Sequence, residues 1–463
     1  MIKFGTDGWR AVIAKDYTFD NVKILSQAIA DYLKKEKRSQ KKIVIGYDTR
    51  FLSDEFAITV ACVLAANGVK VVLADSCVPT PVVSFHAKYN KYDLGVMITA
   101  SHNPAPFNGL KIKTKEGGSA DKVITDEVEA LIGKNKCGWL EIEKAKEKKL
   151  VEIKDLSAEY IRFLKGFVDL KIIKKRKVKV LLDLMYGSGG DFVEKILGKS
   201  NVKIDYLHRE KNPSFGGTNP EPVENNLGEL IKKVKKDKYD LGIALDGDAD
   251  RIAMVDNRGN YINAQVLLPL LGIHMVKNRK ASGGIGKTVV GSNLIDTVAL
   301  SLGVACYETP VGFKYLSRLF KENLICIGGE EAGGIGYKGY IPERDGSLSF
   351  LLLLEMIAYE GKSFEQLLLN LYKKYGKWYY CRGSISVKSV KNGLENLKLP
   401  VDLYGNKIER VNNLDGIKLI TKNNWLMFRK SGTEPIVRVY AESKSLKEAQ
   451  KLVSLGKQMI YDL

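Results

Sequence analysis

The sequence predicts an α/β protein built from about four pieces. A chain of 463 residues is longer than one hydrophobic core usually supports. Apolar segments at 42–47, 94–99, 178–183 and 241–245 each end in a polar or Gly-rich turn that a helical pattern follows. Such alternation is typical of α/β layers, and their ligands bind beyond the carboxyl ends of the strands. Functional residues are therefore expected in these turns.

Charge-rich, weakly patterned segments at 141–152, 256–260 and 372–377 divide the chain. They predict units at 1–150, 151–256, 257–372 and 373–463. The first three are of similar length and could be related folds. The last differs, because short strand-like runs at 385–387, 425–429 and 436–441 precede an amphipathic helix from Leu446. It predicts a small α+β domain.

Composition indicates an ordinary folded protein, with 45% hydrophobic and 27% charged residues. The longest apolar run, 348–359, is too short to cross a bilayer and predicts a buried helix. No export signal is visible at the start, so we expect a cytoplasmic protein and no membrane partner. The net charge of +19 suggests nucleic acid, but the lysines are spread along the chain. This favours a solvated surface that attracts small anions, with no nucleic-acid partner.

The segment TASHNP at 99–104 directly follows a predicted strand. Asn103 and Pro104 favour a turn, which would leave Ser101 on an exposed, fixed loop. A serine in that place is either a nucleophile that carries phosphate or a helix cap.

The segment DGDADR at 246–251 also follows a strand and carries three aspartates at alternate positions. Carboxylates so close together repel each other unless a hard cation lies between them. A calcium loop of the EF-hand type does not fit, because Arg251 replaces the glycine and Asn257 the final glutamate. Magnesium fits better, and a solvated acidic turn is the alternative.

The segment RKSGTEP at 429–435, followed by Arg438, offers hydroxyls, a small glycine and arginines to a phosphate. Its residue order excludes a Walker A motif, and a basic surface turn is the alternative. Two weaker segments are GTDGWR at 5–10, with a cation at its end, and GGEEAGG at 328–334, whose carboxylates could accept sugar hydroxyls.

Together and in this order, these five segments resemble the α-D-phosphohexomutase family, which includes phosphoglucomutase, phosphomannomutase and phosphoglucosamine mutase. The resemblance runs from Phe4 to Arg438. It implies four domains around a central cleft, namely three related α/β domains with mixed sheets and a smaller α+β domain. Unit 1–150 would hold the phosphoserine loop, 151–256 the magnesium loop, 257–372 the sugar loop and 373–463 the phosphate site.

The resemblance also implies roles for individual residues. Ser101 would be the phosphoserine, and its phosphate would bind Mg²⁺ together with Asp246, Asp248 and Asp250. Catalytic cations would be Arg10, Lys111 in the segment NGLK at 108–111, and Arg251. Lys111 could transfer a proton if its neighbours lower its pKa. The substrate would contact Glu330, Ala332, Arg429, Ser431, Gly432, Thr433 and Arg438, with 309–314 as a further substrate-facing loop.

The implied activity interconverts hexose 1-phosphate and hexose 6-phosphate through phosphoserine and a hexose 1,6-bisphosphate, which also serves as activator. The sugar loop departs from many relatives, because Ala332 replaces a serine and Gly334 a histidine that some carry. Glucose phosphate is the expected substrate, with mannose phosphate second and glucosamine phosphate as a further alternative. A sugar-phosphate phosphatase and a non-catalytic phosphosugar binder are further alternatives. We expect a monomer or a homodimer.

Overall fold

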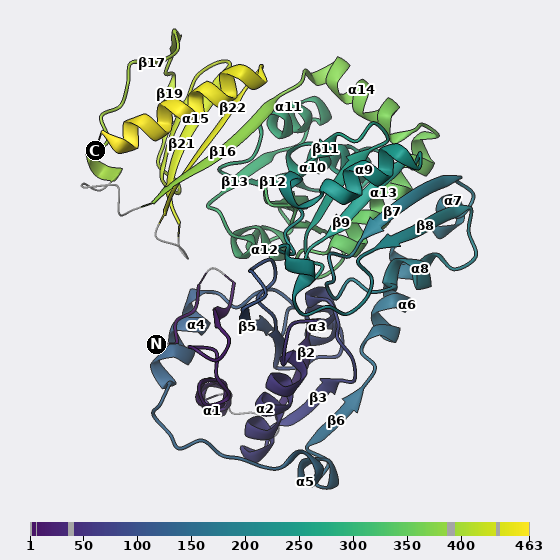
Figure 1. The fold of residues 1–463 in the computed structure, drawn as a ribbon, viewed down its shortest axis with the longest axis vertical. Helices are drawn as coiled ribbons and strands as arrows, with labels where there is room; N and C mark the ends of the chain where they lie inside the picture. Colours follow the sequence, from purple (N-terminus) through teal and green to yellow (C-terminus); the bar gives the residue numbers. More distant parts are fainter. Residues whose placement is uncertain (1, 6, 36–40, 387–393, 432–435, 463) are drawn as a thin grey trace.

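The structure, a computed structural model, describes residues 2–5, 7–35, 41–386, 394–431 and 436–462. The chain forms three α/β units and a C-terminal unit of antiparallel strands with one long helix (Figure 1). In Figure 1 the first unit lies at the bottom, the second and third lie above it and to the right, and the fourth lies at the upper left. Among the described residues, no helix is both long and apolar enough to cross a membrane.

The first unit has a six-stranded mixed sheet in the order β1-β5-β4-β2-β3-β6. Strands β4, β2, β3 and β6 are parallel, whereas β1 and β5 are antiparallel to their neighbours. The strand bounds are β1 Trp9–Val12, β2 Lys42–Tyr47, β3 Lys70–Ala74, β4 Leu94–Ile98, β5 Phe107–Thr114 and β6 Val151–Lys154. The helices are α1 Phe19–Lys34, α2 Ser53–Ala66, α3 Thr80–Tyr89, α4 Lys122–Leu131 and α5 Ile142–Glu147. Because β6 pairs with β3, the first sheet extends past the predicted boundary at residue 150.

The second unit has a mixed sheet in the order β11-β10-β9-β7-β8. Its strands are β7 Val178–Asp183, β8 Val202–Leu207, β9 Leu241–Leu245, β10 Ile252–Asp256 and β11 Tyr261–Ile262. Its helices are α6 Ser157–Phe167, α7 Leu170–Ile173, α8 Phe192–Leu197 and α9 Gly228–Lys236. This sheet too passes a predicted boundary, since β11 lies beyond residue 256 and pairs with β10.

The third unit has the order β13-β12-β14-β15, with only β15 antiparallel. Its strands are β12 Gly284–Thr288, β13 Cys306–Thr309, β14 Ile325–Gly329 and β15 Ile335–Tyr337. Its helices are α10 Ala264–Ile273, α11 Asn293–Leu302, α12 Phe313–Lys321, α13 Gly346–Glu360 and α14 Phe364–Tyr375, with a π-helical turn at His274–Asn278. The run at 348–359 is the buried helix that the sequence predicts, because α13 encloses it and buries most of it.

The fourth unit is an antiparallel sheet in the order β16-β22-β21-β20-β19, with helix α15 packed against it. The bounds are β16 Tyr379–Ser386, β19 Arg410–Asn412, β20 Ile417–Ile420, β21 Asn424–Lys430, β22 Ile436–Ser443 and α15 Leu446–Tyr461. A separate hairpin pairs β17 Asp402–Leu403 with β18 Asn406–Lys407. The predicted α+β character of the last piece is confirmed, although β16 begins earlier than the run at 385–387 and residue 387 lies outside the described part.

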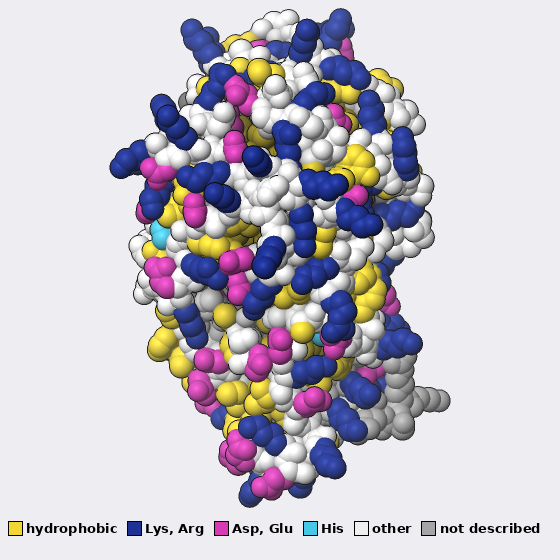
Figure 2. Space-filling view, turned by 90° about the vertical axis from the view of Figure 1, so that its right-hand side faces the viewer, with side chains coloured by type: hydrophobic (Ala, Val, Ile, Leu, Met, Phe, Trp, Pro, Cys, Tyr) yellow, Lys and Arg dark blue, Asp and Glu magenta, His cyan; other side chains and the backbone are white. Residues whose placement is uncertain are grey.

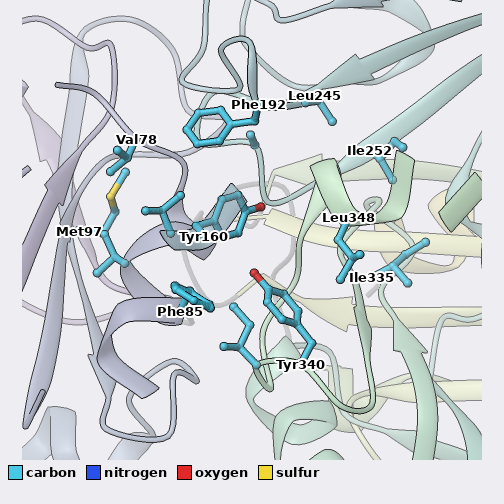
Figure 3. Close-up of a cluster of buried hydrophobic side chains, with 14 of the residues drawn as sticks. Val78, Phe85, Met97, Tyr160, Phe192, Leu245, Ile252, Ile335, Tyr340 and Leu348 are labelled. Carbon is cyan, nitrogen blue, oxygen red and sulfur yellow. The ribbon is translucent and has the colours of Figure 1, made fainter. Parts of the chain in front are cut away.

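One hydrophobic cluster joins the first three units, while the C-terminal sheet has a core of its own. In Figure 3, Val78, Phe85 and Met97 of the first unit face Tyr160 of the second and Tyr340 of the third. A shared core of this kind holds three domains as one body. The fourth unit instead meets the third through a small cluster around Val289 and Trp425, a seam that leaves it more freedom to move.

Basic side chains cover much of the face in Figure 2, and acidic side chains lie among them. The lysine and arginine side chains are spread over this whole face. The picture agrees with the even distribution of lysine along the sequence. A surface of this kind raises the local concentration of small anions near the protein.

Candidate active site

The serine loop connects β4 to β5 and places Ser101 inside the protein. Ser101 is 1% exposed, and its φ of 53° is a left-handed conformation that non-glycine residues rarely adopt. Its hydroxyl donates to Asp246 Oδ2 at 3.0 Å, although the two residues are 145 positions apart. The next element after Ser101 is a strand, so the helix-cap alternative is excluded. Strain of this kind is typical of functional loops.

Arg50 holds the serine loop in place, a role that sequence reasoning missed. Its guanidinium donates to loop carbonyls, which belong to Ser101 (2.6 Å), Asn103 (2.6 Å), Pro104 (2.9 Å) and Phe107 (3.0 Å). Asp48 lies 3.2 Å from Arg50 Nε, and both side chains are fully buried. The polar turn 48–50 directly after β2 was the available signal, because charged residues that follow a buried strand seldom lack a partner.

The three aspartates after β9 form one buried cluster. Asp246, Asp248 and Asp250 are each 0% exposed, and their nearest carboxylate oxygens lie within 4.8 Å of one another. Burial, together with the charges of Asp250 and Asp248, raises the pKa of Asp246 well above its ordinary value. Oδ1 of Asp248 and Oδ1 of Asp250 are buried without a hydrogen-bond partner. A solvated acidic turn is therefore excluded, and the donor set fits a hard divalent cation.

Lys111 lies at the centre of this cluster. Its Nζ is 2.7 Å from Asp248 Oδ2, 3.0 Å from Asp7 Oδ2 and 3.2 Å from Asp250 Oδ2. Burial alone would lower the pKa of Lys111, but the carboxylates outweigh burial and raise it. The condition for proton transfer by Lys111 is therefore not met, because its neighbours stabilise the charged form. Lys111 is thus a buried positive charge among carboxylates.

Two further predicted cations lie at the same place. Arg10 donates to Asn103 Oδ1 at 2.7 Å, on the serine loop. Arg251 Nε lies 3.9 Å from Asp246 and 3.8 Å from Asp250. Burial and the nearby charges of Arg251, Arg10, Lys111 and Arg344 lower the pKa of His102 well below its ordinary value. His102 is therefore neutral, and its Nδ1 lies 3.3 Å from Ser101 Oγ.

Arg344 connects three loops of the site and was also missed. Its guanidinium donates to Glu330 Oε2, Asp7 Oδ2 and Asp250 Oδ2, each at 2.8 Å. Glu330 thus joins the site indirectly, through Arg344. The available sequence signal was the charged pair Glu343-Arg344. The structure shows that the segment around this pair is completely buried.

Gly334 makes room for Arg344. A Cβ at Gly334 would lie 2.1 Å from Arg344 Cδ, so any side chain there would push the arginine away. There is therefore a physical reason why this chain has glycine where some relatives carry histidine. The neighbouring Ala332 is partly exposed, on the turn between β14 and β15.

The predicted phosphate residues lie on the fourth unit. Arg429 and Arg438 are directly opposite each other on β21 and β22, an arrangement of like charges that an anion would stabilise. Asp415 Oδ2 accepts from Arg429 Nε at 2.7 Å and from the Val311 N–H at 2.9 Å, which ties the strand to the loop 309–314. Ser431 follows β21, while Gly432 and Thr433 lie outside the described residues.

The structure brings the predicted catalytic and metal residues together: Ser101, Arg10, Lys111, Asp246, Asp248, Asp250 and Arg251. Among the described residues, no hydrogen bond or ion pair links Arg429 to this cluster. A buried serine hydroxyl beside a cation site and fixed positive charges is suited to phosphoryl transfer. The fold and the site thus define an α/β enzyme of the phosphoryl-transfer class.

Comparisons with known proteins identify the family. Family models described as phosphoglucomutase/phosphomannomutase alpha/beta/alpha domains I, II and III match residues 1–137, 158–259 and 263–375, and the C-terminal domain model matches 387–454. The chain belongs to this family, the α-D-phosphohexomutases, and is a phosphohexomutase.

Individual relatives span nearly the whole chain. A phosphoglucomutase/phosphomannomutase of Thermococcus kodakarensis is 30% identical over 99% of this chain and 98% of its own. A phosphoglucosamine/phosphogalactosamine mutase of Sulfurisphaera tokodaii is 32% identical over 99% and 98%. The crystal structure of a Thermus thermophilus protein, provisionally assigned as a phosphomannomutase, is 32% identical and has a TM-score of 0.88 over 99% of both chains. The relatives differ in the hexose that their names give.

Proposed function

We propose that this phosphohexomutase interconverts hexose 1-phosphate and hexose 6-phosphate through phosphorylated Ser101 and a hexose 1,6-bisphosphate. The observation that carries the proposal is the hydrogen bond between Ser101 Oγ and Asp246. It places the only serine of the loop 99–104 against the cluster that fits a divalent cation. Phosphate on Ser101 would lie between that cation and the positive side chains of Arg10 and Lys111.

The proposed step exchanges one phosphorus–oxygen bond for another. A sugar hydroxyl attacks the phosphoryl group, a new bond forms to the sugar oxygen, and the bond to Ser101 Oγ breaks. Across the step the sugar hydroxyl loses a proton and the serine oxygen regains one. His102 Nδ1 lies 3.3 Å from Ser101 Oγ and can hydrogen-bond to it, while the lowered pKa of the ring makes it a weak base. The proton that the sugar hydroxyl loses is equal in number to the one that the serine oxygen regains, so the step balances with His102 neutral throughout.

Asp246, Asp248 and Asp250 would hold Mg²⁺. The ion, when bound, would neutralise charge on the phosphoryl oxygens. Thr80 and Lys111 fix the carboxylate of Asp248 by hydrogen bonds, and Asp246 Oδ1 accepts from the Arg251 N–H at 3.0 Å. Positions held this firmly lower the reorganisation that transfer requires.

The remaining phosphate would bind the fourth unit through Arg429, Ser431 and Arg438, together with Gly432 and Thr433. Because either phosphate can occupy this site, the bisphosphate could turn over and return its second phosphate to Ser101. The same bisphosphate would prime unphosphorylated enzyme, as an activator. The four units would share a central cleft. Movement of the separately packed fourth unit would close this cleft over the sugar.

Glucose phosphate is the proposed substrate, and glucosamine phosphate is the strongest second candidate. Glucosamine phosphate is favoured by the carboxylate of Glu331, which is partly exposed beside Glu330 on the sugar loop. This carboxylate could accept a hydrogen bond from the ammonium group of glucosamine. The Sulfurisphaera tokodaii relative also has a name of this class. Mannose phosphate remains the other alternative.

A substrate panel tests the proposal. Purified protein receives Mg²⁺, a trace of glucose 1,6-bisphosphate and in turn the 1-phosphates of glucose, mannose and glucosamine. We expect 6-phosphate ester as product, fastest from glucose, and almost no activity in Ser101→Ala or Asp248→Ala. Release of free sugar and inorganic phosphate would indicate a phosphatase instead. Full activity of both variants on every hexose would exclude the mechanism.

A further inference from the structure

A basic cavity lies at the seam between the first and third units, and its lining residues are separate from the catalytic cluster. Its volume is about 600 Å³, within the range of small-molecule sites. Four lysines line it, Lys88 and Lys115 from the first unit and Lys321 and Lys338 from the third, against one carboxylate, Glu116. The excess of positive charge is local and comes from both sides of the seam.

Lys88 is the most constrained of these lysines. Its side chain is partly buried on α3, and burial lowers its pKa. It donates to the carbonyl of Tyr340 at 2.6 Å, but among the described residues no carboxylate forms an ion pair with it. Its Nζ also lies 5.3 Å from the centroid of the Tyr89 ring. The carbonyl and the ring are both neutral, so the positive charge of this half-buried ammonium group has no described carboxylate to compensate it. An anion in the cavity would supply the missing negative charge.

The other lysines of the cavity also favour an anion as its ligand. Lys338 donates to the carbonyl and hydroxyl of Ser282, so its position is fixed at the edge of the cavity. Lys115 lies in the turn after β5 and Lys321 ends α12, and both are exposed. In the described part of the chain, neither has an ion-pair partner, and each is long enough to turn toward a bound anion.

We infer that this seam cavity binds a small molecule that carries phosphate, as a site separate from the catalytic one. Lysine ammonium groups are common phosphate ligands, and several of them around one cavity suit a group with more than one negative charge. The inference does not depend on the proposed reaction, because none of the cavity residues belongs to the catalytic cluster.

The elements that line the cavity also lead to the active site. Helix α3 begins with Thr80, which donates to the metal-site residue Asp248, and carries Lys88 near its other end. The segment after β15 passes the cavity at Tyr340 and reaches the site at Arg344. An anion held between Lys88 and this segment would therefore fasten two supports of the active site to each other.

A titration with matched variants tests the site. Inorganic pyrophosphate and glycerol 3-phosphate are each titrated calorimetrically into the wild type, a pocket variant and a control. The pocket variant is Lys115→Glu with Lys321→Glu, which alters exposed residues only. The control is Lys134→Glu with Lys236→Glu, which makes the same charge change at one turn lysine and at the last residue of α9, away from the cavity.

The result expected is a loss of at least tenfold in affinity for one or both anions in the pocket variant, with the control within twofold of the wild type. The tighter of the two anions tells whether the site prefers inorganic or ester phosphate. Binding at the catalytic site stays the same in all three proteins. Equal isotherms for the wild type and the pocket variant would overturn the inference. Equal losses in the pocket variant and the control would do so too, because they would show attraction to surface charge in general.

Discussion

At the residue scale, Arg344 shows how one side chain connects the loops of the candidate active site. Its planar fork reaches the sugar loop, the N-terminal loop and the metal loop at once, with three carboxylate contacts of 2.8 Å. The attraction of these carboxylates exceeds the effect of burial and raises the pKa of Arg344 well above its ordinary value. No lysine could satisfy three directions in one plane.

We predict that Arg344→Ala lowers the free energy of unfolding by about 3–5 kcal/mol, because it leaves buried carboxylates without their partner. Arg344→Lys should lose less stability but nearly as much mutase activity, since it keeps the charge and loses the fork. Denaturant unfolding and kcat/KM, measured on both variants, separate the two effects. An active, stable Arg344→Ala would show that the network is dispensable.

His208 makes the stability of the folded protein depend on pH, and the direction of this dependence follows from the shift in its pKa. Its hydrogen bond with Asp183 at 2.9 Å raises the pKa of the imidazole, although burial opposes the rise. The folded protein therefore binds this proton more tightly than the unfolded chain. The resulting stabilisation is fully present below the unfolded pKa of about 6.5 and is lost as pH rises through the folded pKa.

His208→Gln should accordingly be less stable than the wild type in mildly acidic solution, and the difference should shrink in alkaline solution. Unfolding in urea at both conditions measures it. A difference that is constant with pH would mean that the charge of His208 contributes nothing. A difference that grows with pH would contradict the sign of the shift.

At the scale of elements, the turn between β14 and β15 depends on a missing side chain. Gly334 lies against the stem of Arg344, so its lack of a Cβ allows the arginine to reach Glu330. Gly166 near the end of α6 offers a contrast, because nothing lies within 4 Å of a Cβ there.

Gly334→Ala should therefore reduce both stability and activity by displacing Arg344. Gly166→Ala should be neutral or stabilise the protein by up to about 1 kcal/mol, since alanine favours a helix. Melting temperature and kcat/KM of the two variants provide the comparison. Equal behaviour of both would show that the close contact at Gly334 relaxes without cost.

Several elements were predictable because local pattern and tertiary burial agree. The strands at 42–47, 178–183 and 241–245 have the predicted bounds, since apolar runs between polar turns allow few other structures.

The site was predictable where its residues cluster in sequence, as at 246–250. Arg50 and Arg344 escaped because their partners lie far along the chain, and no local pattern reports a contact such as Arg344 with Asp7. The raised pKa of Lys111 has the same origin, three carboxylates from two distant loops.

At the scale of the whole molecule, the division into a three-unit body and a separately packed fourth unit matters most. The body holds Ser101 and the aspartates, whereas Arg429 and Arg438 lie on the fourth unit. The sequence predicted four pieces, but it could not tell that three of them share one core, because packing between domains leaves no periodic signal. In the proposed function, transfer would therefore occur on the three-unit body and phosphate binding on the separately packed fourth unit.

Arg429→Ala should raise KM for hexose phosphate by about tenfold to a hundredfold, the loss expected for a charged hydrogen bond to phosphate. Its effect on stability should be small, because its partner Asp415 is partly exposed. The matched control is Arg410→Ala, an exposed arginine on β19 of the same sheet. Steady-state kinetics of both variants test the assignment, and an unchanged KM in Arg429→Ala would remove the fourth unit from phosphate binding.

Phosphate on Ser101 is the central claim, and peptide mass spectrometry tests it directly. The protein is incubated with glucose 1,6-bisphosphate and Mg²⁺ and then digested, and the peptide that contains Ser101 is weighed before and after a chase with excess glucose 1-phosphate. The account predicts one phosphate on Ser101 that disappears in the chase as bisphosphate forms. An enzyme that turns over hexose phosphate while Ser101 never carries phosphate would contradict it.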